Sequence, residues 1–269
     1  MKFSLKQLIT STVITSAIAL TGCGSEEQNS NTITLGVIAG AEEQVAEVAK
    51  KVAKERYDLD VKLVTFTDYI TPNAALADGS VDINAFQHKP YLDQQIADRG
   101  YPLAIAGNTF VYPIAGYSKT VTSVSELDNG ARIAVPNDPT NLGRSLLLLE
   151  KQGLITLREG VGLMATVRDI TANPKQLDIV ELEAAQLPRA LDEVAIAVIN
   201  NTFAASVDLT PEKNGIFVED KDSPYVNLIV ARKENVADER VKTFIKAYQS
   251  EEVYQAANTI FNGSVVKGW

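Results

Sequence analysis

Aromatic side chains gather in two short segments that each follow a predicted strand. The segments read FTDY (66–69) and FQHKPY (86–91), and the ends of neighbouring strands lie close together in an α/β fold. The rings could enclose the apolar side chain of a ligand, and a thioether gains about 0.3–1.5 kcal/mol from each aromatic contact. Ordinary packing in the core is the alternative for each ring. The candidates for an apolar wall are Tyr69, Phe86, His88 and Tyr91.

A basic side chain stands near the expected start of a very apolar helix. Arg144 closes the segment PNDPTNLGR (136–144), which precedes four leucines at 146–149. Four leucines in a row point to all sides of a helix, so the helix should be buried almost all round. A cation in its first turn opposes the helix dipole, and on a buried helix it needs a partner. A bound anion would supply one, as would a carboxylate of the protein, and exposure to solvent is the third reading.

Asparagines stand at the ends of two further predicted strands, in VINN (198–201) and SPYVN (223–227). A side-chain amide can accept a hydrogen bond from an ammonium group and donate one to a carboxylate. Asparagine is also common in turns for backbone reasons. These residues are therefore weak indications of a binding site on their own.

The chain lacks the common signatures of hydrolases and nucleotide-binding enzymes. It contains no Gly-x-Ser-x-Gly, His-Glu-x-x-His or Gly-x-x-x-x-Gly-Lys-Ser/Thr motif. The single histidine, His88, has no evident orienting carboxylate for work with a serine, and one histidine with one cysteine argues against a metal site. We expect a binding protein with no catalytic residue, no cofactor and no metal; a small-molecule hydrolase is the weaker alternative.

The charge balance excludes another class of partner. The 269 residues include 25 Lys and Arg against 34 Asp and Glu, a formal net charge of −9. Nucleic-acid binding needs a basic surface to neutralise phosphates, so no nucleic-acid partner is expected.

The first residues have the order of a secretory signal peptide: a basic start, a short apolar run to Leu20, and then Thr21-Gly22-Cys23. The apolar run is too short for a comfortable membrane span. LTGC (20–23) resembles the bacterial lipobox, which implies lipidation of Cys23, with palmitate among the acyl chains; a free thiol or an intermolecular disulfide are the alternatives. Residues 1–22 would be the signal peptide, and residues 23–31 the lipidated cysteine with a flexible polar tether.

Strand and helix patterns alternate through the rest of the chain. Strands are predicted at 32–39, 60–66, 81–86, 103–118 with a break near Pro113, 132–135, 177–182, 194–199 and 225–230. Helices are predicted at 42–56, 71–79, 90–99, 140–152, 186–191, 238–250 and 252–261.

This alternation predicts an α/β fold with parallel-rich sheets covered by helices. Two such blocks meet near Val111 and again near Val230. They suggest lobe I from residues 32–111 plus 230–269 and lobe II from residues 112–229. A ligand cleft should lie between the lobes, at the carboxyl ends of the strands.

Five segments resemble the methionine-binding lipoproteins of bacterial methionine ABC importers, the NlpA lipoprotein family. The resemblance runs from the lipobox through Trp269, and it is most specific in FQHKPYL and NDPTNLGRSLLLL. The segments are FTDYITPNAALADGSVDINAFQHKPYLDQQ, NTFVYPIAGYSK, VPNDPTNLGRSLLLLEKQGLI, VELEAAQLPRALDEVAIAVIN and SPYVNLIV.

The resemblance implies a two-lobed periplasmic binding protein fold of type II that binds free methionine between its lobes. By position, Arg144 matches the arginine that holds the ligand carboxylate. The asparagines that bind the amino and carboxylate groups match Asn141, Asn200 and Asn227, and the wall around the thioether matches Tyr69, Phe86, His88 and Tyr91.

The resemblance also implies partners and a location. The partners are a membrane permease with its ATPase subunit, and the chain should be a monomer. It should be held in the cell envelope by its N-terminal lipid on a bacterial membrane, with the globular part in the periplasm. Another amino acid or a short methionine-containing peptide is the alternative ligand.

Overall fold

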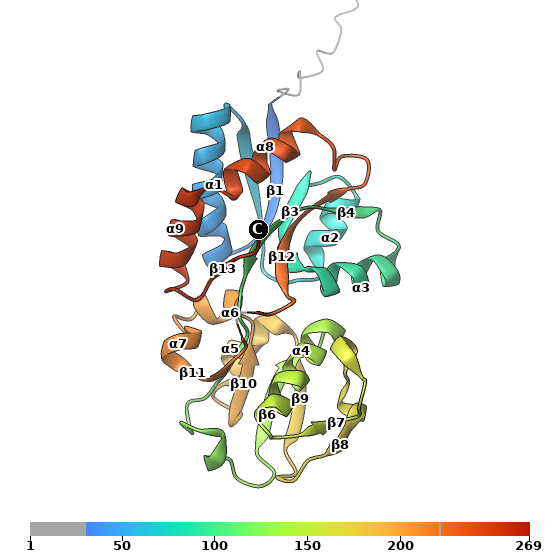
Figure 1. Cartoon of the computed structure of the whole chain (residues 1–269), viewed down its shortest axis with the longest axis vertical. Helices are drawn as coiled ribbons and strands as arrows, with labels where there is room; N and C mark the ends of the chain where they lie inside the picture. Colours follow the sequence, from blue (N-terminus) through green and yellow to red (C-terminus); the bar gives the residue numbers. More distant parts are fainter. Residues whose placement is uncertain (1–30, 221) are drawn as a thin grey trace, which may run out of the picture. The chain divides into compact units, whose positions relative to one another are not determined.

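The computed structural model describes residues 31–220 and 222–269, and Asn31–Trp269 form one compact unit. The predicted signal peptide, Cys23 and all of the predicted tether except Asn31 lie outside the described residues. Within the unit the strands form a six-stranded sheet, a five-stranded sheet and a two-stranded pair (Figure 1). None of the helices in the described part of the chain is long and apolar enough to cross a membrane.

The first sheet has the order β13-β4-β12-β3-β1-β2. β1 pairs in parallel with β2 and β3, whereas β12 is antiparallel to both β3 and β4, and β13 is antiparallel to β4. The strands are β1 (Thr32–Ile38), β2 (Asp60–Phe66), β3 (Ile83–His88), β4 (Leu103–Val111), β12 (Val226–Arg232) and β13 (Val266–Lys267).

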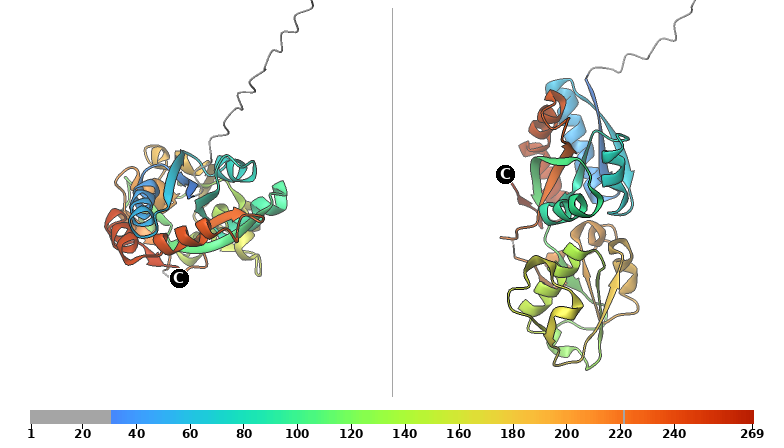
Figure 2. Two further views of the ribbon diagram at one scale, coloured as in Figure 1. Left: turned by 90° about the horizontal axis from the view of Figure 1, so that it is seen from above. Right: turned by 90° about the vertical axis from the view of Figure 1, so that its right-hand side faces the viewer.

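Helices cover both faces of the first sheet (Figure 2). One face carries α1 (Ala41–Tyr57), α8 (Glu239–Tyr248) and α9 (Glu251–Ile260), and the other carries α2 (Thr71–Ala77) and α3 (Lys89–Arg99). Alternate residues of β12 show the consequence, since Ile229 and Ala231 join one apolar cluster while Leu228 and Val230 join the other. The central strands are therefore buried on both sides.

The second sheet has the order β11-β5-β10-β6-β9. β6 is parallel to β9 and β10, and β5 is antiparallel to β10 and β11. The strands are β5 (Ala115–Tyr117), β6 (Arg132–Pro136), β9 (Asp178–Leu182), β10 (Ile196–Ile199) and β11 (Gly215–Val218), and the separate pair is β7 (Thr156–Leu157) with β8 (Ile170–Ala172).

Helix α4 (Pro139–Lys151) is the main cover of the second sheet. Asp138 caps its N-terminus by accepting a hydrogen bond from the backbone of Asn141 at 2.9 Å, and Pro139 takes the first helical position. Three of its four consecutive leucines are buried and Leu147 is half-buried, as the run predicted. Shorter helices complete the region: α5 (Leu187–Ala190), α6 (Asn201–Ala205) and α7 (Pro211–Asn214).

The chain passes between the two sheets in two segments, which we call the connecting segments. Residues 112–114 lead from β4 to β5, and residues 219–225 lead from β11 to β12. The two segments are hydrogen-bonded to each other, because the backbone N–H of Glu219 donates to the carbonyl of Ile114 at 3.0 Å. The exact division into lobes at residues 111/112 and 229/230 stays a prediction.

Both sheets are mixed, whereas the alternating pattern favoured parallel-rich sheets. The connecting segments give the reason. Parallel neighbours need a long crossover, usually a helix. β5 and β12 instead arrive directly from the other sheet, and each lies antiparallel to its neighbours. The short elements β7, β8, β11, β13, α6 and α7 were not predicted.

Two boundaries near the expected binding loops differ from the prediction. β3 runs to His88, where the predicted strand ended at residue 86, because it pairs with β12 as far as the register His88–Asn227. Arg144 is the sixth residue of α4 and so lies in its second turn, not its first. The dipole argument for an anion at Arg144 is weakened by that position, since the effect fades beyond the first turn.

Candidate functional site

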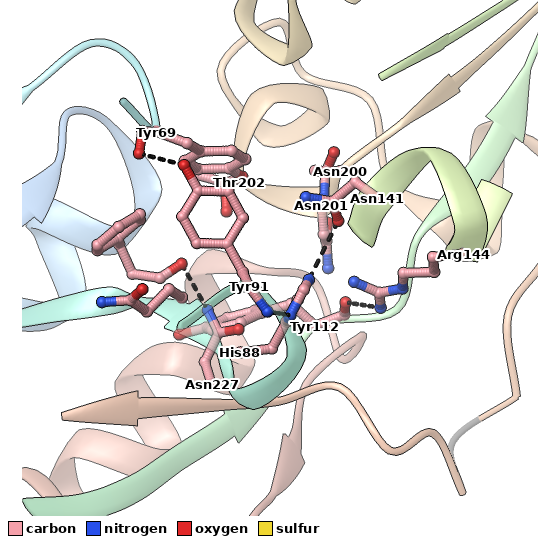
Figure 3. A pocket seen from close by; sticks show the side chains of 12 residues that line it. Tyr69, His88, Tyr91, Tyr112, Asn141, Arg144, Asn200, Asn201, Thr202 and Asn227 are labelled. Carbon is pink, nitrogen blue, oxygen red and sulfur yellow. Dashed lines mark hydrogen bonds between the residues drawn. The ribbon is translucent and has the colours of Figure 1, made fainter. Parts of the chain in front are cut away.

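A small cavity lies between residues of the two sheets (Figure 3). The first-sheet side contributes the ends of β2, β3 and β12 and the start of α3, and the second-sheet side contributes α4 and the start of α6. Its lining consists of polar and aromatic side chains: Tyr69, Phe86, Gln87, His88, Tyr91, Tyr112, Asn141, Arg144, Asn200, Asn201, Thr202 and Asn227.

One side of the cavity is aromatic. The ring centroids of Tyr69 and Phe86 are 5.8 Å apart, and those of Phe86 and Tyr91 are 6.0 Å apart. The Tyr91 hydroxyl donates to the backbone carbonyl of Tyr69 at 2.6 Å, which fixes the two rings relative to each other. Such separations are usual for tilted and edge-to-face pairs. The wall is therefore preformed and offers ring faces and edges to an apolar ligand group.

His88 is held as a neutral ring. It caps the N-terminus of α3, where its Nδ1 accepts from the Tyr91 backbone N–H at 3.2 Å, and its Nε2 lies 3.2 Å from Oδ1 of Asn141. An accepting Nδ1 assigns the proton to Nε2. Burial, followed by the nearby Arg144 charge, lowers the His88 pKa to about 3. At neutral pH this ring is thus a polar, uncharged part of the cavity wall.

The asparagines link the two sides of the cavity. Asn141 accepts from Nδ2 of Asn200 at 3.0 Å as well as from His88, and its own Nδ2 donates to Asp138 at 2.9 Å. Across the cavity, Nδ2 of Asn227 donates to the carbonyl of Phe86 at 3.1 Å. The Oδ1 of Asn200 is buried and has no hydrogen-bond partner among the described residues. A buried acceptor without a donor is costly, so this atom suits a hydrogen-bond donor on a ligand.

Arg144 is the one cavity residue with a lasting charge. Its guanidinium pairs with the carboxylate of Glu219, through Nε at 2.8 Å and through Nη2, and Nη2 also donates to the Tyr112 carbonyl at 3.0 Å. The guanidinium group lies over the ring of Tyr225, with Cζ of Arg144 4.3 Å from the ring centroid.

No partner within the described residues takes the two N–H groups of the third guanidinium nitrogen, Nη1. Figure 3 shows the guanidinium directed toward His88 and Asn141, on the side of the cavity opposite Tyr69 and Tyr91. A carboxylate of the protein therefore holds one edge of the guanidinium, and another edge faces the cavity. Two of the three alternatives that the sequence left open, a protein carboxylate and a bound anion, remain compatible with this geometry.

A second buried acid lies directly behind the cavity wall. Glu42, in the first turn of α1, is 2% exposed and accepts a hydrogen bond from the hydroxyl of Thr202. Its Oε2 has no partner among the residues described here. Burial raises the Glu42 pKa to about 8, so the carboxyl group is mostly protonated at neutral pH. The contact ties α1 of the first sheet to the cavity residue Thr202 of α6.

Gln87 is fixed by a buried amide network. It exchanges hydrogen bonds with Asn73 at 2.6 and 2.7 Å, and both residues also bond Asn84. Satisfied buried networks of this kind hold side chains in one orientation.

The structure brings together all eight side chains that the sequence singled out, since each of them lines the cavity. Their contact with a ligand stays a prediction. Sequence reasoning missed four lining residues: Gln87, Tyr112, Asn201 and Thr202. Two of them had a signal, because Gln87 lies inside the FQHKPY segment and Asn201 follows Asn200 directly. Glu219 had none, being one of 34 acidic residues and 75 positions from Arg144.

Comparison with known proteins bears on this cavity. The NlpA lipoprotein family model matches residues 33–269. The chain belongs to the NlpA lipoprotein family. It is 69% identical, over the full length of both proteins, to a probable D-methionine-binding lipoprotein MetQ of Vibrio cholerae. Solved structures share the fold as well. A crystal structure of the methionine-binding protein MetQ is 66% identical, with a TM-score of 0.89 over 90% of this chain and 99% of that one.

A further similar structure holds a ligand. It is described as a nutrient-binding protein from Burkholderia cenocepacia bound to methionine, with 48% identity and a TM-score of 0.86 over 88% of this chain and 100% of that one. The fold is therefore that of the methionine-binding and nutrient-binding proteins to which this NlpA chain is similar.

Proposed function

We propose that this chain is the substrate-binding lipoprotein of a bacterial ABC importer and that it captures free methionine in the cavity. One observation carries the proposal. The cavity holds an unpaired donor edge on Arg144 and an unpaired acceptor on Asn200, beside a preformed wall of aromatic rings. A ligand carboxylate can accept from the donor edge of Arg144, and a ligand ammonium group can donate to the acceptor on Asn200. A thioether suits the aromatic wall.

The cavity is small and lies between residues of both sheets, which supports a small ligand over a peptide. The names of the similar proteins also support methionine, since they bind D-methionine or hold methionine in a solved structure.

Binding works as a clamp between two lobes, divided as the sequence predicted. The ligand's head group docks on Arg144 and the asparagines, the thioether enters the ring wall, and closure removes both from water. Residues of both sheets line the cavity, which supports this mode. The head-group contacts must offset the desolvation of two charges, so each missing partner is costly.

The chain's wider role follows from the same proposal. It is a binding protein and not an enzyme, and it hands methionine to a membrane permease driven by an ATPase subunit. Lipid on Cys23 anchors the monomer to a bacterial membrane in the cell envelope, with the binding unit in the periplasm. The names of the similar proteins, which are lipoproteins and methionine-binding proteins, support this placement.

Isothermal titration calorimetry on the full-length protein tests the proposal. Methionine should bind, and alanine, which lacks the thioether, should bind more weakly. Substitution Arg144→Ala should weaken methionine binding by about 2–5 kcal/mol, the usual effect of unpairing a buried charge. Arg132→Ala serves as a control, because that arginine is half-exposed in a surface ion pair with Asp178. Unchanged methionine affinity in Arg144→Ala would show that Arg144 does not bind the ligand carboxylate. Tighter binding of a methionine-containing peptide than of methionine would show that the peptide is the ligand.

A further inference from the structure

The edge of Arg144 that is turned away from the cavity carries an acid. Glu219 accepts from Nε and Nη2 of Arg144, and the two side chains are only 13% and 4% exposed, respectively. Glu219 also receives the backbone N–H of Ile114 at 3.4 Å. It does not line the cavity, and the family resemblance gave it no role. Its carboxylate is nevertheless the nearest charge to the group that faces the ligand.

The remaining groups around the cavity add no net charge at its wall. His88 is neutral at physiological pH because burial lowers its pKa to about 3, and Glu42 behind Thr202 is mostly protonated. Asp138 lies outside the lining and is bound at the N-terminus of α4, whose dipole offsets a negative charge. The lining thus has one cation, Arg144, and that cation is matched by one buried anion.

We propose that Glu219 is a specificity-determining residue, because it cancels the charge of Arg144 and so makes the cavity prefer a net-neutral zwitterion to an anion of the same shape. The inference rests on the proposed function, in which the methionine zwitterion is the ligand. Glu219 acts through Arg144 in two ways. It orients the guanidinium plane, and it opposes the entry of a second negative charge that no ammonium group accompanies.

The physical reason is the difference between a pair and a lone cation. A ligand carboxylate that meets Arg144 is attracted by the guanidinium and repelled by Glu219, and at low local dielectric neither effect is screened away. An ammonium group on the same ligand offsets the negative charge of the ligand carboxylate, so the site with its ligand has no net charge. A ligand without the ammonium group leaves an uncompensated negative charge in a buried site, which is the costly arrangement.

A matched pair of ligands separates charge from shape. Methionine is a zwitterion, and 2-hydroxy-4-(methylsulfanyl)butanoate replaces its ammonium group with a hydroxyl group and carries a net negative charge. The quantity to measure is the ratio of their dissociation constants, obtained by calorimetry on the same full-length protein. Differences in hydrogen bonding between hydroxyl and ammonium are the same in every variant, so a change in the ratio between variants reports charge.

The deciding variant is Glu219→Gln, which keeps the shape and removes the charge. The wild-type protein should favour methionine over the hydroxy acid, and the substitution should reduce that preference at least tenfold. Methionine affinity itself should fall, because the amide holds the guanidinium less firmly. A preference that stays at the wild-type value would overturn the proposal, even if both ligands bind more weakly.

Two further variants guard the conclusion. Glu193→Gln removes an exposed acid from the same half of the chain and should leave both affinities unchanged. Glu219→Asp keeps the charge on a shorter side chain, so it should weaken binding while keeping the preference; loss of the preference in this variant would also overturn the charge role. If Glu219→Gln does not fold, Glu219→Ala, which also removes the charge, is measured in the same way.

The test distinguishes this inference from the function on which it rests. A wild-type protein that binds neither ligand would refute the proposed function, and the Glu219 role would fall with it. A wild-type protein that binds methionine, with a preference that does not respond to the charge at position 219, would refute the Glu219 role alone.

Discussion

Glu42 shows how a single residue can set the pH response of the protein without touching the ligand. The side chain lies on the buried stripe of α1, together with Val45, Ala46 and Ala49. Most acids in a first helical turn are there to match the helix dipole and are exposed. Glu42 instead supports the cavity residue Thr202 from behind, in a place where a charge is unfavourable.

Glu42→Gln should therefore stabilise the protein in a pH-dependent way. The folded protein keeps the Glu42 proton up to its pKa of about 8, whereas the unfolded chain loses it near the ordinary value of 4.5. The stability that this group contributes is complete below about pH 4.5 and is lost as the pH rises through about 8, with a slope of about 1.4 kcal/mol per pH unit. Denaturant unfolding of both proteins at about pH 5 and about pH 8 measures the difference.

The variant's advantage should grow between these two pH values, because the glutamine has no proton to lose. Glu47→Gln in the same helix is the control, since that side chain is exposed and its pair with Lys50 is worth little. An advantage that is constant or shrinks with rising pH would contradict the assignment of a protonated carboxyl group.

At the residue scale, long and specific segments led to residues that line the cavity, although their contact with a ligand stays a prediction. Arg144 and the rings at positions 69, 86 and 91 stood out from residue type and position alone. The asparagines were chosen by family resemblance, since an amide in a turn has several ordinary explanations. Glu219 could not be found, because ion pairs between distant positions have no local pattern. Glu42 did leave a signal, as an acid on an otherwise apolar stripe.

At the scale of elements, α4 brings the binding residues and the core together. Its N-terminal half carries Asn141 and Arg144, and its C-terminal half carries the leucines that pack on the second sheet. Gly143 lies between the two binding residues, directly before Arg144. A Cβ atom there would lie 2.1 Å from the backbone oxygen of Leu163, so the helix approaches the 3-10 turn Gly162–Met164 as closely as a glycine allows.

Gly143→Ala should therefore destabilise the protein, although alanine is the better helix former. In an open helix the change would gain about 1 kcal/mol. Here the contact with backbone forces a shift that costs about 1–3 kcal/mol, so the sign reverses. Thermal and denaturant unfolding measure the change in the free energy of unfolding. Lys151→Ala, at the exposed end of the same helix, is the control. A gain in stability from Gly143→Ala would show that the helix and the turn are not in contact.

Elements were predictable where periodicity was long. The helices over 42–56, 140–152 and 238–250 were found within a few residues because each has a full apolar stripe. The strands β7, β8 and β13, of two or three residues each, carry too few side chains for a period to show. Strand direction was also out of reach in part, because β5 and β12 enter their sheets from the other half of the molecule.

For the whole molecule, one compact unit that encloses its ligand should respond to that ligand as one unit. The cavity takes residues from both sheets, so methionine should stabilise all of Asn31–Trp269 and not one half. At a methionine concentration of 100 times Kd, the free energy of unfolding should rise by about 2.7 kcal/mol. For a chain of this size that is a rise in Tm of about 5–10 °C.

Differential scanning calorimetry checks this expectation. A single transition that moves upward with methionine is the expected result, and Arg144→Ala should show little or no movement. Two transitions, of which methionine moves only one, would mean that the ligand engages residues of one sheet alone.

The position of Arg144 has a consequence for how an empty receptor differs from a filled one. Its guanidinium holds the carbonyl of Tyr112 and the carboxylate of Glu219, one on each connecting segment. In the proposed clamp these segments are the hinge, so a ligand that draws the guanidinium toward itself would pull on both segments at once. Closure on the ligand would then change the outline of the molecule, which a neighbouring protein could sense from outside.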